Sequence, residues 1–277
     1  MDDLQRPSMD GEILSIGRGS NKAIASIICG RGRVGKTVVA NTMVQFFRKH
    51  GANLEVWNSD RQNETHSLNL FHQDASRPAT DDPEEKRAWF EGNLDRQGHQ
   101  RFDVVMDMAG GDPMIRQLAG DVRLVQTMER SGIRAVAWHV LGPEAADLDY
   151  LRLSMDGGLF MPKATFLVLN TGLVNLRSVE AAFATVINDK VVKLAIDQGA
   201  ILVWFPRLIC MQALIDQGLS FEDAIRGVTK PGHQSLSMTD EARVEIFWEE
   251  QVPKFFGELP PEWLPAMGGL PANAVGV

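Results

Sequence analysis

The stretch AIASIICGRGRVGKTVVANTMVQFFRK, residues 23–49, joins three local patterns that together decide the fold. Its first part, 23–29, is almost entirely apolar, which is typical of a strand covered on both faces of a sheet. Residues 38–49 place apolar side chains three and four positions apart, as on one face of a helix. Between them, GRGRVGKT at 30–37 matches the phosphate-loop pattern G-x-x-x-x-G-K-[ST]. We therefore predict a nucleotide-phosphate site at the start of this helix.

The residue types of this loop fit the chemistry of a bound nucleotide. Glycines let the backbone approach closely enough for successive N–H groups to point at phosphate oxygens. The helix that begins near Lys36 adds the positive end of its dipole. Lys36 is expected to reach the β- and γ-phosphates, and the Thr37 hydroxyl is expected to ligate Mg²⁺. The predicted nucleotide-binding residues here are Gly30, Arg31, Gly32, Arg33, Val34, Gly35, Lys36, Thr37 and Val38.

Further apolar runs follow along the chain, and segments with helical spacing separate them. The runs are LEVW (54–57), FDVVMDM (102–108), IRAVAWHVL (133–141), ATFLVLN (164–170) and AILVWF (200–205). The helical segments cover roughly 113–129, 143–155, 176–198 and 208–227. Strands that alternate with helices imply right-handed βαβ units. We predict an α/β fold, a doubly wound, mostly parallel sheet with helices on both faces.

Composition divides the chain into a leader, one domain and a tail. The predicted parts are a flexible leader at 1–21, a phosphate-loop domain at 22–258 and a Pro/Gly-rich tail at 259–277. Within the domain, the polar and acidic stretch 74–86 is interpreted as a solvated excursion. Residues 238–259 predict a final helix, which Pro253 is expected to kink or end.

The composition also restricts the class of protein. The 277 residues are long enough for a sizeable core and lack the biases of collagen-like, disordered or disulfide-rich chains. Two cysteines fit a reducing compartment, and the acidic N-terminus without an apolar core predicts no secretory signal. We expect a cytoplasmic protein with no membrane anchor. The formal net charge of −8 disfavours a nucleic-acid coat but does not exclude local DNA contact. Arg207 and residues 226–230 are candidates for that contact, although a solvated surface is the favoured interpretation for them.

An acidic residue, Asp107, stands near the C-terminal end of the apolar run 102–108. A carboxylate at the C-terminal end of a buried strand lies beside the phosphate site in this architecture and can hold Mg²⁺ through water. The alternative is that Asp107 only caps the next loop. Gly110 and Gly111 just beyond it would let that loop move with the γ-phosphate.

The phosphate loop also contains G-x-G-x-x-G at 30–35, the pattern of a dinucleotide-binding fold. That fold needs an acidic residue about 20 positions later, at the end of the second strand, and Asp60 meets this requirement approximately. Lys36 and Thr37 would have no function there, whereas they fit a triphosphate with magnesium. An NAD(P)-dependent oxidoreductase is therefore the least favoured hypothesis.

Together these elements resemble the ParA/MinD family of deviant-Walker P-loop ATPases, over about residues 22–230. The family loop reads GKGGVGKT where this chain has GRGRVGKT, and its D-x-D-P-Q-like motif corresponds to NSDRQ at 58–62. Its hydrophobic-D-x-P-G motif corresponds to DMAGG at 107–111, and its adenine-pocket pieces to FLVLN at 166–170 and ILVWFP at 201–206. Within the family, the order of segments is most similar to the TraL-type transfer ATPases of conjugative plasmids.

The resemblance implies Mg-ATP as the ligand and a role for each matching residue. The implied roles are phosphate binding for Lys36, Mg²⁺ coordination for Thr37 and Asp107, positioning of the attacking water for Asp60, adenine recognition for Asn170 and closure of the base pocket for Pro206. Lys36, Asp60 and Arg31 are the expected catalytic residues.

Three positions depart from the family pattern. Arg31 replaces the signature lysine, which in the family reaches across a sandwich dimer to the partner's nucleotide; an arginine there would make bidentate phosphate contacts. Arg33 replaces a glycine, which is expected either to strain the loop or to alter the seam of the dimer. Asn58 replaces the first aspartate of its motif and removes one carboxylate near the metal. These changes are compatible with slow hydrolysis.

Three hypotheses follow. The first is an ATPase switch that forms an ATP-dependent homodimer and binds a partner protein of plasmid partition or conjugative DNA transfer. The second is a non-hydrolysing, nucleotide-bound adaptor of a transfer or secretion apparatus. The third is the oxidoreductase described above.

The cysteine, histidine and tryptophan residues outside these motifs are expected to have structural roles in the core or to lie on the surface. Cys29 is expected in the core, and His66 and His72 are expected on the surface. The tryptophans divide into two groups: Trp57, Trp138 and Trp204 are expected in the core, and Trp248 and Trp263 are candidates for a partner surface.

Overall fold

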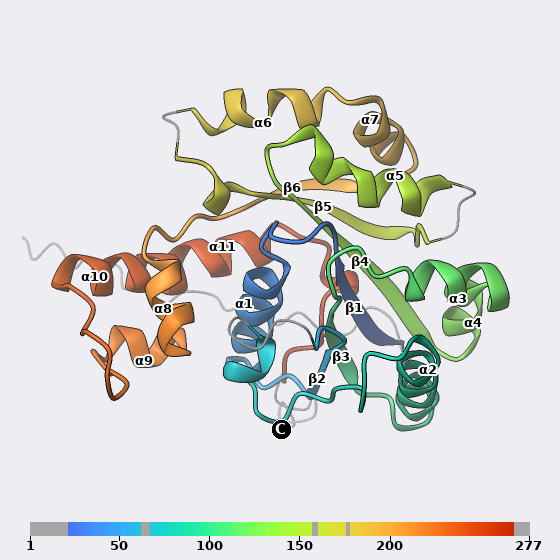
Figure 1. The fold of residues 1–277 in the computed structure, drawn as a ribbon, viewed down its shortest axis with the longest axis horizontal. Helices are drawn as coiled ribbons and strands as arrows, with labels where there is room; N and C mark the ends of the chain where they lie inside the picture. Colours follow the sequence, from blue (N-terminus) through green and yellow to red (C-terminus); the bar gives the residue numbers. More distant parts are fainter. Residues whose placement is uncertain (1–21, 62–66, 157–159, 176–177, 269–277) are drawn as a thin grey trace, which may run out of the picture.

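The computed structural model describes residues 22–61, 67–156, 160–175 and 178–268, and its centre is one sheet (Figure 1). The strands are β1 (Ala23–Cys29), β2 (Leu54–Asn58), β3 (Asp103–Asp107), β4 (Ile133–Leu141), β5 (Ala164–Asn170) and β6 (Ile201–Phe205). The 6-stranded sheet has the order β2-β3-β1-β4-β5-β6, and every pairing in it is parallel. Each apolar run of the sequence forms one of these strands, which confirms the predicted fold class.

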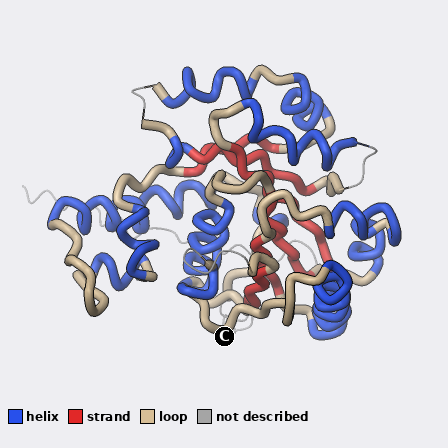
Figure 2. The backbone as a smooth tube through the Cα atoms, in the orientation of Figure 1, coloured by secondary structure: helices blue, strands red, loops and turns tan. Residues whose placement is uncertain are grey.

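Helices cover both faces of the sheet, as Figure 2 shows with helices in blue around the red strands. One face carries α1 (Lys36–Lys49), α8 (Met211–Gln217), α9 (Phe221–Ile225), α10 (Met238–Ile246) and α11 (Val252–Gly257). The other carries α2 (Pro83–Gln100), α3 (Met114–Val122), α4 (Leu124–Arg130), α5 (Asp149–Met155), α6 (Val179–Ile187) and α7 (Lys190–Asp197). Among the described residues, no helix has the length and apolar character that crossing a membrane requires.

Strand β1 illustrates why the runs are continuously apolar. Ile24 and Ile28 pack with α1 and the C-terminal helices, whereas Ala25, Ile27 and Cys29 pack on the opposite face. Successive side chains of a strand point to opposite faces, so a strand covered on both sides needs an apolar residue at every position. The prediction that Cys29 belongs to the core is confirmed, because its side chain is fully buried.

Helix α2 begins inside the stretch interpreted as a solvated excursion, so that interpretation is wrong for its C-terminal part. The Asp82 side chain accepts hydrogen bonds from the backbone N–H groups of Glu84 and Glu85, and Pro83 occupies the first turn. The helix has little apolar periodicity, because two of its three buried residues, Lys86 and Gln97, are polar and the third is Phe90. This weak periodicity explains why the pattern does not reveal it.

The predicted helical segments are often two short helices rather than one. In the segment 113–129, α3 ends and α4 begins at Arg123, whose φ of 50° breaks the helical path. In the segment 208–227, Gly218 with φ 57° separates α8 from α9. A left-handed residue at a helix C-terminus is a common stop signal, and periodicity alone does not report it.

The C-terminal helical run does not end at Pro253. A π-helical segment, Phe247–Gln251, joins α10 to α11, and Pro253 lies in the first turn of α11. A proline ring clashes with the carbonyl of the preceding turn, and the wider π turn relieves this conflict. Trp248 in the π segment is buried and stacks on Phe221 at 4.8 Å between ring centroids, so it is a core residue and not part of a partner surface.

The chain after α11 returns to the sheet. Leu264 is buried, and Trp263 packs against Phe166 with 5.3 Å between ring centroids. The backbone N–H of Ala266 donates to Asp103 Oδ2 at 2.8 Å, at the start of β3. Residues 259–268 therefore pack on the domain, as far as the described part of the tail extends.

The parallel order places the loops after the strands along one edge of the sheet. β1, which leads into the phosphate loop, lies directly beside β3, and Ile28 pairs with Asp107. The loops after β2 and β3 lie on one side of the phosphate loop, and the loops after β5 and β6 lie on the other. Ligands of open parallel sheets bind at this carboxyl edge.

Candidate functional site

The phosphate loop turns into α1 at Gly35. Gly35 has a φ of 90°, a conformation that side chains disfavour, and a Cβ there would overlap the side-chain amide of Asn170. That amide donates a hydrogen bond to the Val34 carbonyl at 2.8 Å. Asn170, at the end of β5, therefore holds the turn by which the loop enters the helix.

Lys36, Thr37 and Asp107 meet at the base of this loop. The Lys36 ammonium donates to the Arg31 carbonyl at 3.1 Å, and the Thr37 hydroxyl donates to Asp107 Oδ2 at 2.7 Å. The other carboxylate oxygen, Asp107 Oδ1, is buried without a hydrogen-bond partner. A buried acceptor beside a threonine hydroxyl fits Mg²⁺, which proteins hold at nucleotide sites through one or two oxygens completed by phosphates and waters. Within the described ranges, no group of His, Cys, Asp and Glu side chains forms a separate metal cluster.

Burial changes the acidity of this carboxylate. Burial raises the pKa of Asp107 to about 6, although the nearby Lys36 ammonium and the Thr37 hydrogen bond favour the ionised form. A cation at Oδ1 would also favour the ionised form. At pH 7 the carboxylate is therefore mostly ionised, at a cost that a bound cation would offset.

The loop after β2 carries Asp60 and is held by Asn58. The buried Asn58 side chain donates to Ser67 Oγ at 2.9 Å and to Asn69 Oδ1 at 2.7 Å, and its oxygen accepts from the Asp60 N–H at 3.0 Å. A carboxylate cannot donate, so an aspartate here would lose both outgoing bonds. Asn58 thus organises the loop that presents Asp60 to the cavity.

A cavity of about 1190 Å³ opens along the carboxyl edge of the sheet. The predicted site residues that line it are Gly32, Arg33, Gly35, Lys36, Thr37, Val38, Asp60, Asn170 and Pro206. Gly30, Arg31, Val34 and Asp107 are not among the described residues that line it, and Asp107 lies buried behind Thr37. Asn41, Asp81, Lys86 and Asp112 do line it, and the sequence interpretation does not include them. The cavity joins the phosphate loop to the loops on both of its sides.

Arg31 points to a different place from Lys36. Its guanidinium lies 3.4 Å from Asp147 Oδ1 and 3.6 Å from Glu144 Oε2, and its side chain is 49% exposed. Glu144 is exposed, so its pair with Arg31 contributes little to stability, whereas Asp147 is buried and its pair with Arg31 costs more to break.

Arg33 adopts a φ of 69°, so the strain expected from the sequence at this position is present. The left-handed region costs a non-glycine residue roughly 1 kcal/mol. We expect Arg33→Gly to raise the free energy of unfolding by about 0.5 kcal/mol, because glycine relieves this strain but gains entropy in the unfolded chain. Chemical denaturation measures the change.

Arg123→Gly is the matched control, since Arg123 is exposed, has a φ of 50° and lies outside the cavity wall. A loss of stability in Arg33→Gly with a gain in Arg123→Gly would contradict the assignment of strain to the loop.

Two further expectations are wrong, and His66 lies outside the described residues. His72 is buried and its Nε2 lies 2.9 Å from Asn41 Oδ1. Burial, together with the nearby Arg48 charge, lowers the pKa of His72 to about 4, so the ring is neutral. Trp204 is 39% exposed because β6 is an edge strand, whereas Trp57 and Trp138 are buried as predicted.

The strand order argues against the dinucleotide interpretation. In a dinucleotide fold the second strand lies directly beside the first, so that its terminal acid reaches the ribose. Here β3 separates β2 from β1. Asp60 therefore stands one strand further from the phosphate loop than that fold requires, and Asp107 occupies the nearer position.

No family model and no curated protein sequence matches the chain. Similar solved structures include MinD from Aquifex aeolicus, with 14% identity over 86% of this chain and 99% of that chain and a TM-score of 0.47. A single-residue variant of McdA from Cyanothece, in complex with ATP, has 12% identity over 87% of this chain and 99% of that chain, with a TM-score of 0.46. FtsY from Thermotoga maritima has 13% identity over 84% of this chain and 70% of that chain, with a TM-score of 0.43. Similarity at this level carries no argument about activity.

The fold itself rests on the chain's own elements. A phosphate loop joins β1 to α1, Asp107 ends the neighbouring β3, and helices cover both faces of the parallel sheet. The chain has the α/β fold of a P-loop NTPase.

Proposed function

We propose that this protein is a nucleotide-switched ATPase of the ParA/MinD type that binds Mg-ATP and hydrolyses it slowly. The observation that carries the proposal is the pairing of Thr37 with Asp107 behind the Lys36 loop, which leaves Asp107 Oδ1 buried and without a partner. A dinucleotide site gives these three residues no common task, whereas a magnesium-bound triphosphate uses all of them.

Each residue has a defined task in this proposal. The backbone N–H groups of residues 32–37 and the N-terminus of α1 bind the phosphates, and Lys36 neutralises their charge. Thr37 and Asp107 hold Mg²⁺, which when bound offsets charge on the β- and γ-phosphates. Asp60 orients the attacking water from the loop after β2. The base lies toward Asn170 and Pro206, which line the same cavity.

We place the switch in plasmid partition or conjugative DNA transfer, with an ATP-dependent homodimer and a partner protein that distinguishes the two nucleotide states. In this proposal Arg31 leaves the exposed Glu144 and the buried Asp147 to reach the partner subunit's nucleotide, where phosphate oxygens replace the two carboxylates as its anionic partners. Cytoplasmic location follows from the same setting.

The second candidate is an adaptor that binds ATP without turnover. Two observations favour it. Arg31 contacts two acidic side chains of its own chain, and Asn58 is committed to hydrogen bonds that hold its loop. Both residues stand where the resemblance expects groups that promote hydrolysis.

Phosphate release from Mg-ATP, with and without double-stranded DNA, separates the two candidates. For the ATPase we expect measurable turnover in the wild type and at least about a tenfold decrease in Arg31→Ala, because a transition-state arginine contributes that much or more. Stimulation by DNA would support the partition setting.

Arg134→Ala is the control, because Arg134 lies on β4 and its guanidinium donates to the Glu262 carbonyl, away from the cavity wall. Bound ATP without turnover in the wild type would favour the adaptor, and equal turnover in wild type and Arg31→Ala would remove the role of Arg31.

A further inference from the structure

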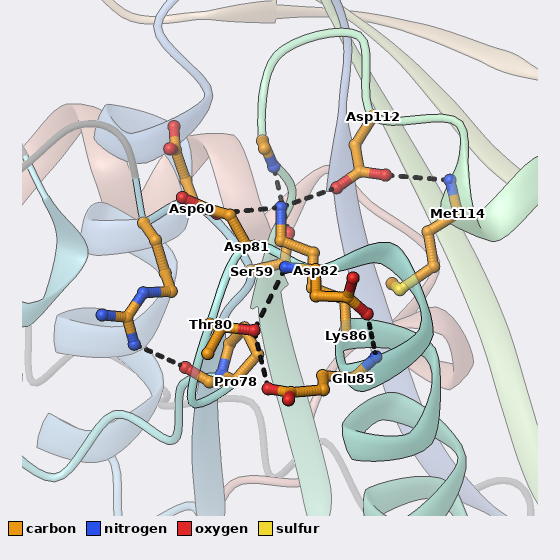
Figure 3. Close-up of polar contacts among 12 residues, drawn as sticks. Ser59, Asp60, Pro78, Thr80, Asp81, Asp82, Glu85, Lys86, Asp112 and Met114 are labelled. Carbon is orange, nitrogen blue, oxygen red and sulfur yellow. Dashed lines mark hydrogen bonds and ion pairs between the residues drawn. The ribbon is translucent and has the colours of Figure 1, made fainter.

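A buried lysine outside the phosphate loop lies in the wall of the same cavity. The Lys86 side chain on α2 is 10% exposed, and its ammonium lies 3.2 Å from Asp81 Oδ1 and 3.6 Å from Asp112 Oδ2. Figure 3 shows it reaching from the helix to these two carboxylates. Asp112 is equally shielded, with an 8% exposed side chain. Removing an ammonium from water costs several kcal/mol unless anions compensate it, so this lysine needs anionic partners in every state of the cavity.

The position of Lys86 is fixed from two directions. Asp82 caps α2, and the helix continues for 18 residues to Gln100, so Lys86 stands on a rigid element. The segment before the helix is tied to the loop after β2, because the Arg61 guanidinium donates to the Pro78 carbonyl at 2.8 Å. The Thr80 hydroxyl adds a bond to Glu85 at 2.6 Å (Figure 3).

Asp112 connects this lysine to the loop that follows Asp107. The Asp112 carboxylate accepts from the Met114 N–H at 2.8 Å, at the first residue of α3. Two residues earlier, the loop touches the phosphate loop: a Cβ at Gly110 would lie 2.8 Å from Gly32 Cα and 3.5 Å from the Lys36 ammonium. The segment from Gly110 to Met114 therefore lies against Lys36 at Gly110 and against Lys86 at Asp112.

A terminal phosphate in this part of the cavity would have to compete with carboxylates for the ammonium groups. Three carboxylates, Asp60, Asp81 and Asp112, line it together with two ammonium groups, Lys36 and Lys86. Two carboxylates share Lys86. A terminal phosphate would compete with them, and a phosphate with its higher charge is the stronger partner for an ammonium.

We propose that Lys86 is a γ-phosphate-binding residue supplied by the same chain, and that it exchanges Asp112 for the γ-phosphate when ATP is bound. The exchange frees Asp112 and so couples the terminal phosphate to the start of α3, which makes the segment from Gly110 to Met114 the element that responds to the nucleotide. ADP lacks the phosphate that drives the exchange. This inference rests on the proposed function and adds to it the residue that distinguishes ATP from ADP.

The test is the ratio of Mg-ATP to Mg-ADP affinity in wild type, Lys86→Ala and Arg87→Ala, measured by calorimetry. We expect Lys86→Ala to lower the preference for ATP about tenfold, the value of one charge-assisted contact, and to leave ADP affinity within about twofold. Arg87→Ala is the matched control, since Arg87 is the next residue of α2 and pairs with Glu91 and Asp121 on the surface. It should behave as wild type.

Asp112→Asn should change the ratio of ATP to ADP affinity in the opposite direction, and it is the variant to measure if Lys86→Ala does not fold. Removing the competing carboxylate should raise the preference for ATP about threefold or more, because Lys86 then loses less on exchange. An unchanged ratio in Lys86→Ala, or in Asp112→Asn where only that variant folds, would overturn the inference and leave the proposed function intact. A wild-type protein that binds neither nucleotide would overturn the proposed function itself, and this inference with it.

Discussion

Replacing Lys36 with alanine should lower ATP turnover at least about 100-fold, because the ammonium offsets charge that develops on the transferred phosphate. The fold should survive the change. The Lys36 side chain is largely buried and donates one hydrogen bond, to the backbone carbonyl of Arg31; a bond with a charged donor contributes about 1.5–3 kcal/mol to stability, less than the stability of a typical domain. Phosphate release and thermal unfolding, measured on the same preparation, separate the two effects.

Lys49→Ala is the control for this change, because Lys49 ends the same helix and pairs with Glu222 and Glu249 far from the loop. It should keep wild-type turnover. Turnover in Lys36→Ala equal to that of the wild type would show that the observed activity arises elsewhere or from a contaminant, and would remove the assigned site.

Replacing Asp107 with asparagine should have opposite effects on two properties: it should lower Mg-dependent turnover and raise the stability of the protein without ligand. The amide keeps an acceptor for the Thr37 hydroxyl but cannot offset the charge of Mg²⁺, so we expect Mg-dependent turnover to fall at least about 100-fold. The protein without ligand should become more stable at pH 7. The folded-state pKa of Asp107 is raised from 3.8 to about 6, so the native state loses stability as pH rises between these values.

In the wild type, keeping Asp107 ionised in the folded state at pH 7 lowers the free energy of unfolding by about 3 kcal/mol, as the pKa shift implies. Asparagine is neutral at every pH and removes this destabilisation. The gain should vanish below about pH 4, where the aspartate is protonated in both states. Chemical denaturation at both pH values measures it. Asp103→Asn, at the other end of β3, is the control: its carboxylate accepts from the Ile24 and Ala266 N–H groups, so it should lose stability and keep metal dependence. A less stable Asp107→Asn at pH 7 would contradict the account.

The strands and the phosphate loop could be predicted because their signals are local. A buried parallel strand needs an apolar residue at each position, and the run at 23–29 coincides with β1 residue for residue. The run at 133–141 coincides with β4 in the same way. The loop between β1 and α1 has its glycines where backbone geometry demands them, as at Gly35.

What could not be predicted depends on tertiary contacts. Trp204 looks like a core residue in its run, but β6 ends the sheet and exposes it. His72 looks like a surface residue, but its loop folds over α1 and pairs it with Asn41. Lys86 lies in an acidic, polar stretch, and only the packing of α2 beside the loop after β3 brings it to Asp112. The residues DDPEE at 81–85 do carry a local helix-start signal, in the capping aspartate and the proline.

Equilibrium binding of ATP to the purified protein, measured by calorimetry with Mg²⁺ and with EDTA in its place, tests the Mg-ATP site directly. We expect one ATP per chain, an affinity at least about tenfold lower in EDTA because Thr37 and Asp107 act through the metal, and no comparable binding of NAD. Equal ATP affinity with and without Mg²⁺, or binding of NAD in preference to ATP, would contradict the proposed Mg-ATP site.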